Sequence, residues 1–111
     1  MIMYPEIYER CITACLQCSL DCEQCYVACV GENKPELSPC ILLDRDCADI
    51  CLLAAQLMSR GSNFAPALCN LCAEICEACA GECLKHEHMD HCRMCAESCR
   101  LCADECRKIS L

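Results

Sequence analysis

The chain has few aromatic residues, no segment apolar enough to cross a membrane and no excess of positive charge. Its 111 residues include no tryptophan and one phenylalanine, so we expect a core of small side chains. The formal net charge of −8 at pH 7 argues against a nucleic-acid partner, because the phosphate backbone would repel it. The N-terminal stretch lacks the basic and apolar segments of an export signal, so we expect a protein of the reducing cytosol.

Cysteine, in contrast, is far more abundant than in an ordinary protein, with nineteen residues. Most of them follow one another at alternating steps of three and four. Because an α-helix advances 3.6 residues per turn, this spacing keeps the thiols on one helical face. Eight CxxxC pairs contain sixteen of the cysteines: Cys11/Cys15, Cys18/Cys22, Cys25/Cys29, Cys47/Cys51, Cys72/Cys76, Cys79/Cys83, Cys95/Cys99 and Cys102/Cys106. The other three are Cys40, Cys69 and Cys92.

This spacing predicts four helices, over about residues 5–30, 39–60, 65–85 and 90–108. We expect them to form a single domain that spans residues 1–111. Short connections between helices of similar length are typical of an antiparallel up-down-up-down bundle. The predicted fold is therefore an all-α four-helix bundle with a thiol-lined core. Charged residues fall mostly outside the cysteine faces and are expected to form the solvated surface.

Local signals at the helix ends add more detailed expectations. Gly31 is predicted to end the first helix, and Ser38 to cap the second helix ahead of Pro39. Asp90 is the predicted N-cap of the fourth helix. Gly81 lies inside the third helix, where glycine is unfavourable, so we expect a neighbouring backbone or a metal to approach it closely.

A purely structural role does not explain so many inward thiols, because alanine, valine or leucine would fill a core without the risk of oxidation. Disulfides are also disfavoured. The cysteine count is odd, and the Cβ directions of residues three or four apart on one helix seldom allow a bridge. Metal binding explains the pattern better. Side chains four apart on a helix have Cβ atoms about 5–6 Å apart, so two sulfurs can lean around one ion.

The spacing also distinguishes between metals. A soft ion such as Cu(I) accepts two or three thiolates, which suits the CxxxC pair. Zinc needs four tetrahedral ligands, usually supplied by turns that a helical CxxxC pair lacks. The loop signature of a ferredoxin cluster, which ends in Cys-Pro, is not present. Cu(I) is therefore the main hypothesis, with a zinc or cadmium thiolate reservoir and an iron–sulfur redox protein as alternatives.

A four-helix bundle lined with CxxxC pairs, with histidine and methionine near one end, resembles the bacterial copper storage proteins. With nineteen cysteines and no export signal, the chain is most similar to their cytosolic branch. The resemblance covers nearly the whole chain, and it implies storage of many Cu(I) ions in each bundle and assembly as homotetramers. The second predicted helix departs from the pattern because it carries fewer thiols. The residues that stand there instead are Asp44, Ala54, Ala55 and Met58.

Candidate ligands other than cysteine gather between the third and fourth predicted helices. In an up-down bundle this connection lies at the same end as the connection after the first helix, near Cys40 and Cys92. Imidazole and thioether bind Cu(I) more weakly than thiolate, which favours capture followed by transfer inward. We therefore predict a copper entrance formed by His86, His88, Met89, His91 and Met94. Met1 and Met3, at the opposite end, are interpreted as terminal residues without this role.

The sequence thus predicts a cytoplasmic Cu(I) storage or buffering protein without enzymatic activity, since no catalytic set of side chains is visible. The expected partners are copper ions and a copper chaperone or small thiol that delivers them, and neither nucleic acid nor membrane. Charge sets the expected capacity. Isolated two-thiolate sites would each leave a buried negative charge, whereas one Cu(I) per thiolate makes the interior neutral. We therefore expect bridged clusters and about one Cu(I) per cysteine.

Overall fold

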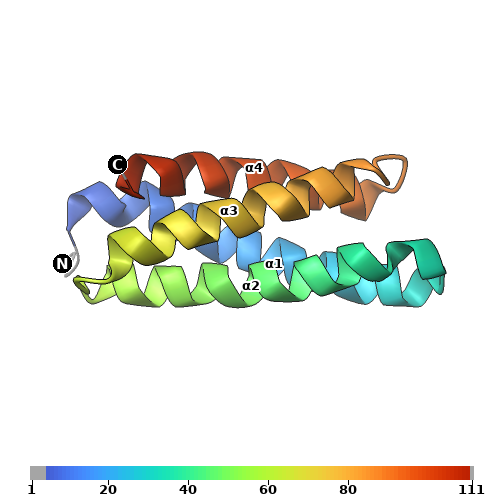
Figure 1. Cartoon of the computed structure of the whole chain (residues 1–111), viewed down its shortest axis with the longest axis horizontal. Helices are drawn as coiled ribbons and strands as arrows, with labels where there is room; N and C mark the ends of the chain where they lie inside the picture. The colour runs from blue at the N-terminus through green and yellow to red at the C-terminus, as the bar shows by residue number, and fades with distance from the viewer. Residues whose placement is uncertain (1–4, 111) are drawn as a thin grey trace.

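The computed structural model describes residues 5–110, which form four antiparallel α-helices (Figure 1). Two short 3-10 turns, η1 (Glu6–Tyr8) and η2 (Pro35–Leu37), precede the first and second helices. The predicted all-α up-down-up-down bundle is confirmed. The helices are α1 (Glu9–Glu32), α2 (Ser38–Ser59), α3 (Ala65–Leu84) and α4 (Asp90–Ser110).

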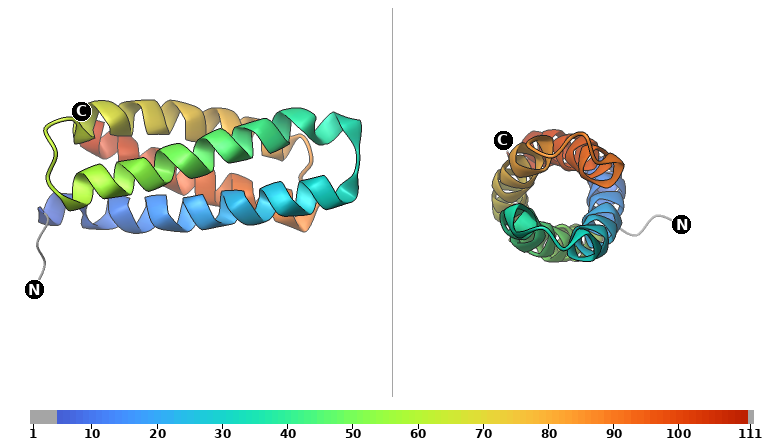
Figure 2. Two further views of the ribbon diagram at one scale, coloured as in Figure 1. Left: turned by 90° about the horizontal axis from the view of Figure 1, so that it is seen from below. Right: turned by 90° about the vertical axis from the view of Figure 1, so that its right-hand side faces the viewer.

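The helices form a ring around one axis, as the view along the bundle shows (Figure 2). α1 packs against α2 and α4, and α3 packs against the same two neighbours. The α1–α2 and α3–α4 connections lie at one end, and the α2–α3 connection lies at the other, with the beginning of α1 and the end of α4 (Figure 1). The end with the α1–α2 and α3–α4 connections is called the mouth below. None of the helices within the described residues is long and apolar enough to cross a bilayer.

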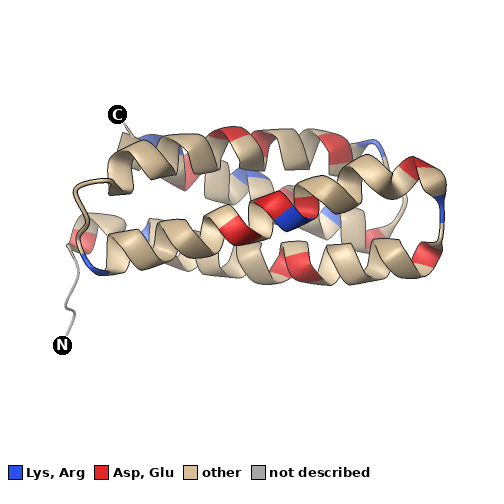
Figure 3. Ribbon diagram, turned by 60° about the horizontal axis from the view of Figure 1, so that its bottom comes forward, with Lys and Arg blue, Asp and Glu red and all other residues tan. Residues whose placement is uncertain are grey.

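The core consists of cysteine and alanine because these residues occupy the inward faces of all four helices. Each cysteine is at most 1% exposed, and small residues such as Ala48, Ala73 and Ala103 fill the adjacent inward positions. Leu37 of η2 and Met58 near the end of α2 are the largest fully buried side chains. Acidic and basic residues are spread along the helices (Figure 3), and among the described residues Asp44 is the only one of them that is buried. Small inward side chains therefore let the four helices surround a column of sulfur atoms.

The helix ends differ from several of the sequence predictions. Gly31 does not end α1, which continues to Glu32 and is capped by Asn33 in the left-handed conformation with φ of 53°. Asparagine tolerates this conformation well enough to replace glycine there. Ser38 does not cap α2 through its side chain, because the chain enters that helix directly from η2 with Pro39 in the first turn.

The expectation for Gly81 is also wrong. Its backbone is exposed, and a Cβ atom placed there would meet none of the described atoms within 4 Å. Neither a neighbouring helix nor the sulfur column therefore requires glycine at this position.

The fourth helix begins at Asp90 itself, where the carboxylate lies in the first turn and 3.1 Å from Arg93.

We predict that Gly81→Ala raises the free energy of unfolding of the reduced apoprotein by about 0.5–1 kcal/mol, because alanine loses less backbone entropy in a helix. Asn33→Ala is expected to lower it by roughly 1 kcal/mol, since alanine is strained at positive φ. Urea denaturation followed by circular dichroism measures both changes. A destabilising Gly81→Ala substitution would show that a close contact does exist at this position.

Candidate metal centre

The buried thiols form a continuous column along the bundle axis. Within single helices, six of the eight CxxxC pairs have Sγ–Sγ distances of 3.8–4.0 Å. This confirms that the three-and-four spacing brings paired sulfurs together on the inward face. All nineteen cysteines lie within the described residues and are free thiols.

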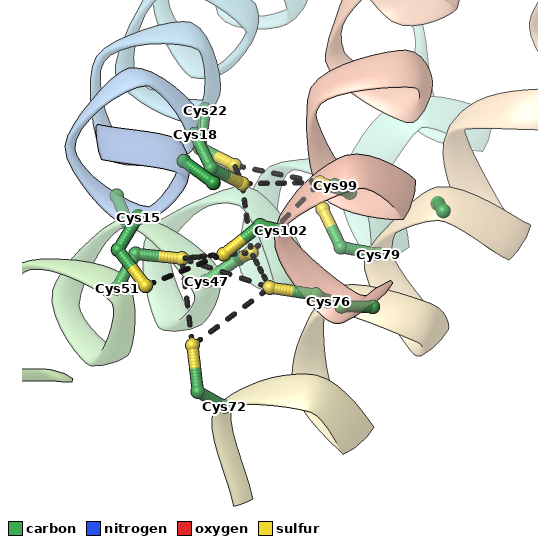
Figure 4. Packing of buried hydrophobic residues seen from close by; sticks show 14 of the residues in the cluster. Cys15, Cys18, Cys22, Cys47, Cys51, Cys72, Cys76, Cys79, Cys99 and Cys102 are labelled. Atoms are coloured by element: carbon green, nitrogen blue, oxygen red, sulfur yellow. Dashed lines mark hydrogen bonds between the residues drawn. The ribbon is translucent and has the colours of Figure 1, made fainter. Parts of the chain in front are cut away.

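Contacts between helices are as short as those within pairs. The Sγ atoms of Cys40 in α2 and Cys83 in α3 are 3.4 Å apart. The sulfurs of Cys15 in α1 and Cys102 in α4 are 3.5 Å apart. Near the middle of the bundle, Cys47 contacts sulfurs of all three other helices (Figure 4). The pairs are therefore not separate sites, because sulfurs of one pair lie at bridging distance from sulfurs on other helices.

Groups of four sulfurs arise where pairs from different helices meet. In each group the sulfurs lie within 4.8 Å of one another, and all four residues are buried. Helical CxxxC pairs therefore do form four-ligand groups, contrary to the expectation from a single helix, because sulfurs from different helices combine. Five of these groups are Cys15/Cys72/Cys102/Cys106, Cys18/Cys47/Cys51/Cys76, Cys18/Cys22/Cys47/Cys99, Cys22/Cys79/Cys95/Cys99 and Cys25/Cys29/Cys40/Cys92.

Burial keeps two thiols near the mouth, those of Cys92 and Cys29, protonated in the apoprotein. It raises the pKa of Cys92 to about 11, and it raises the pKa of Cys29 above its ordinary value. The cause is desolvation, which penalises the thiolate more than the neutral thiol. Because metals bind the thiolate, each ion that enters this region must displace protons.

One carboxyl group is buried among the thiols. Asp44 of α2 is 0% exposed, and its Oδ1 atom accepts hydrogen bonds from Cys79 and Cys95, each at 3.4 Å. The Sγ atoms of Cys83 and Cys40 lie 3.8 and 3.9 Å from its carboxylate oxygens. Burial, followed by the neighbouring thiols, raises the pKa of Asp44 to about 10. The carboxyl is therefore neutral at pH 7.

Asp44 was recognised in the sequence only as a missing cysteine, and its place in the site was not predicted. The signal was present, since Asp44 lies four residues after Cys40 and three before Cys47, on the inward face of α2. The half of α2 farther from the mouth instead carries Ala54, Ala55 and Met58, all of which are buried. Thiols are therefore concentrated on the other three helices at that end.

The predicted entrance residues lie near the mouth but differ in their exposure and in their partners. His91 is partly buried, its Nε2 is shielded from solvent, and no hydrogen-bond partner for that atom exists among the described residues. Met89 packs against the core. His88 is exposed, and Met94 is 55% exposed, so neither lies in the core.

His86, the remaining histidine of this segment, is partly buried, and its Nε2 lies 3.2 Å from the Glu82 carboxylate. It is thus engaged with an acidic side chain. Of the predicted entrance residues, Met89 thus packs against the core, and His91 has a shielded Nε2 without a partner among the described residues. Met1 and Met3 lie outside the described residues.

The fold and the thiol column together define a four-helix bundle whose interior binds soft metal ions. Comparison with known proteins identifies the family: a model described as "Copper storage protein" matches residues 5–111. The chain belongs to the copper storage protein family.

Individual relatives agree with this assignment. The chain is 52% identical over 85 residues to the uncharacterized cysteine-rich protein YhjQ of Bacillus subtilis (strain 168), covering 76% of this chain and 78% of that protein. It is 47% identical to apo-Csp3 of Bacillus subtilis, with a TM-score of 0.87 and coverage of 94% of this chain and 99% of that chain. It is 40% identical to Ccsp of Streptomyces lividans loaded with 10 copper equivalents, with a TM-score of 0.87 and coverage of 95% of this chain and 84% of that chain.

The buried carboxyl group generates a test of pH-dependent stability. Asp44 keeps its proton in the folded state up to about pH 10, whereas the unfolded chain loses it near pH 4. The contribution of protonated Asp44 to the free energy of unfolding is therefore fully present below about pH 4 and is lost as the pH rises towards 10. We predict that the stability of Asp44→Asn relative to wild type increases with pH, by up to about 1.4 kcal/mol per unit. Urea denaturation of the reduced apoproteins between pH 5 and 8 measures this, and a pH-independent difference would contradict a neutral Asp44.

Proposed function

We propose that the protein stores Cu(I) in the cytosol by holding the ions as thiolate clusters inside each bundle, and that it has no catalytic role. The observation that carries the proposal is the column of sulfurs with interhelical distances of 3.4–3.9 Å. Such distances allow a thiolate to bridge ions held by different helices. Soft, monovalent Cu(I) suits sulfur ligands and low coordination numbers.

Charge favours clusters over isolated pairs. A Cu(I) ion bound by two thiolates carries a net charge of −1, and no Lys or Arg of the described residues is buried to compensate for it. Burying several such charges in one narrow core is strongly unfavourable. When each thiolate bridges two ions, the numbers of Cu(I) and thiolate become equal and the interior is neutral. The proposed ligands are all nineteen cysteines, with His91 and Met89 acting at the mouth.

Solved relatives support this function. A structure described as Cu(I)-bound copper storage protein BsCsp3 is 47% identical to this chain, with a TM-score of 0.91 and coverage of 96% of this chain and 100% of that chain. Another describes a cytosolic copper storage protein of Streptomyces lividans with five coppers. We propose for this chain the Cu(I) cargo of the first relative and the cytosolic location of the second.

Delivery and assembly form the finer part of the proposal. A copper chaperone or small thiol would deliver Cu(I) at the mouth, where His91 and Met89 lie beside the first thiols. Exposed apolar side chains on the outside of the bundle, among them Leu42, Leu53 and Leu71, support association into a homotetramer. Neither nucleic acid nor membrane is needed.

The function is tested by the metal content of the protein purified anaerobically from copper-supplemented cells. We predict several Cu(I) ions per chain and only traces of iron, because the four-sulfur groups adjoin one another and are suited to copper clusters. Elemental analysis and an acid-labile sulfide assay give the result. Iron with stoichiometric sulfide, or zinc in place of copper under these conditions, would contradict the proposal.

The entrance is tested by two paired variants. His91→Ala/Met89→Leu is predicted to slow Cu(I) loading and removal at least tenfold while leaving capacity nearly unchanged, because the thiol column is intact. His88→Ala/Met94→Leu is the matched control, since both of these side chains are exposed, and its rates are expected to equal those of wild type. Stopped-flow transfer from a Cu(I)-chelator complex measures the rates. Equal rates in the two variants would exclude the entrance.

A further inference from the structure

Four sulfurs near the middle of the helices form a nearly regular tetrahedron. They belong to Cys18 and Cys22 of α1, Cys47 of α2 and Cys99 of α4. Five of the six Sγ–Sγ distances are 3.7–3.9 Å, and the sixth is within 4.8 Å. The four residues are 0% exposed.

The size of this tetrahedron matches a specific class of ion. The centre of a regular tetrahedron with an edge of 3.8 Å, the Cys47–Cys99 distance, lies about 2.3 Å from each corner. That is the usual Zn–S bond length, and four thiolates in tetrahedral geometry are a common structural zinc site. An ion of this type would bind with little movement of the sulfurs, because three helices already hold them in place.

We propose that the copper-free core binds a divalent, thiophilic ion of tetrahedral preference, such as Zn²⁺, at Cys18, Cys22, Cys47 and Cys99. Each such ion with four thiolates carries a net charge of −2. The other four-thiol groups lie along the same narrow core, so each further ion adds to the buried charge and binds more weakly. The core therefore accepts divalent ions only at low occupancy.

The same charge balance makes the divalent ion replaceable. Four Cu(I) ions on four thiolates are neutral, so exchange of one Zn²⁺ for four Cu(I) removes two buried negative charges. Selectivity for Cu(I) then arises from charge compensation and not from coordination geometry. Binding of the divalent ion is independent of the proposed copper storage, whereas its displacement rests on that function.

Co²⁺ provides a spectroscopic probe for the reduced, metal-free full chain. Under anaerobic conditions the first equivalent is expected to give the strong visible absorption of tetrahedral thiolate-bound cobalt, and the signal should stop growing well before four equivalents. Subsequent Cu(I) should abolish this absorption.

Weak absorption typical of six-coordinate cobalt would overturn the site, and four equal binding steps would overturn the charge limit. Copper binding without a cobalt signal would leave copper storage intact, whereas a cobalt signal that Cu(I) leaves unchanged would contradict storage itself.

A matched pair of variants locates the ion. Cys18→Ala/Cys47→Ala removes two corners of the central tetrahedron, and we expect the dissociation constant of the first Co²⁺ to rise at least tenfold. Cys11→Ala/Cys69→Ala also removes two buried thiols but leaves the tetrahedron intact, so its first dissociation constant should not change. Circular dichroism checks the helical fold, and Cys47→Ala alone replaces the double variant if that variant unfolds. Equal first dissociation constants in the central and control variants would overturn the central site.

Discussion

Neutralisation of thiolate charge is the constraint on which the structure depends, because no Lys or Arg is buried in the part of the chain that the structure describes. The helices bring nineteen thiols inside a single bundle, and burial opposes their ionisation. The protein meets this constraint in two ways. In the apoprotein, protonated thiols and a protonated Asp44 contact one another without net charge. In the loaded protein, equal numbers of Cu(I) and bridging thiolate would again leave the core neutral.

The arrangement of side chains along the bundle follows from this constraint. Cysteine and alanine are small enough for four inward faces to meet with sulfurs at bridging distance, and larger residues such as Leu37 and Met58 stand near the ends of α2. Weaker ligands belong at the mouth, where an ion still has to move. Strong ligands belong inside, where the ion is to remain. With the proposed entrance at the mouth, ligand strength would increase along the axis towards the thiols of the interior.

Much of the fold could be predicted because one periodic signal determines it. Cysteine steps of three and four specify which face of each helix is inward, and short connections then specify the antiparallel order. Contacts between helices could not be predicted in the same way. The tetrahedron that includes Cys47 and Cys99 joins residues far apart in the chain, so spacing within one helix does not reveal it. Asp44 shows a second limit, since the packing of all four helices buries its carboxyl. Asn33 shows a third, since asparagine as well as glycine tolerates the left-handed conformation that ends α1.

The most direct test of the central claim is a titration of reduced apoprotein with Cu(I) in the presence of a competing chelator. Bridging throughout the sulfur column predicts tight binding up to about nineteen equivalents, one for each cysteine. The later ions should bind cooperatively, because each completes clusters that are already partly formed. A sharp end to tight binding at about eight or nine equivalents would contradict the account, since it would indicate isolated pairs with uncompensated charge.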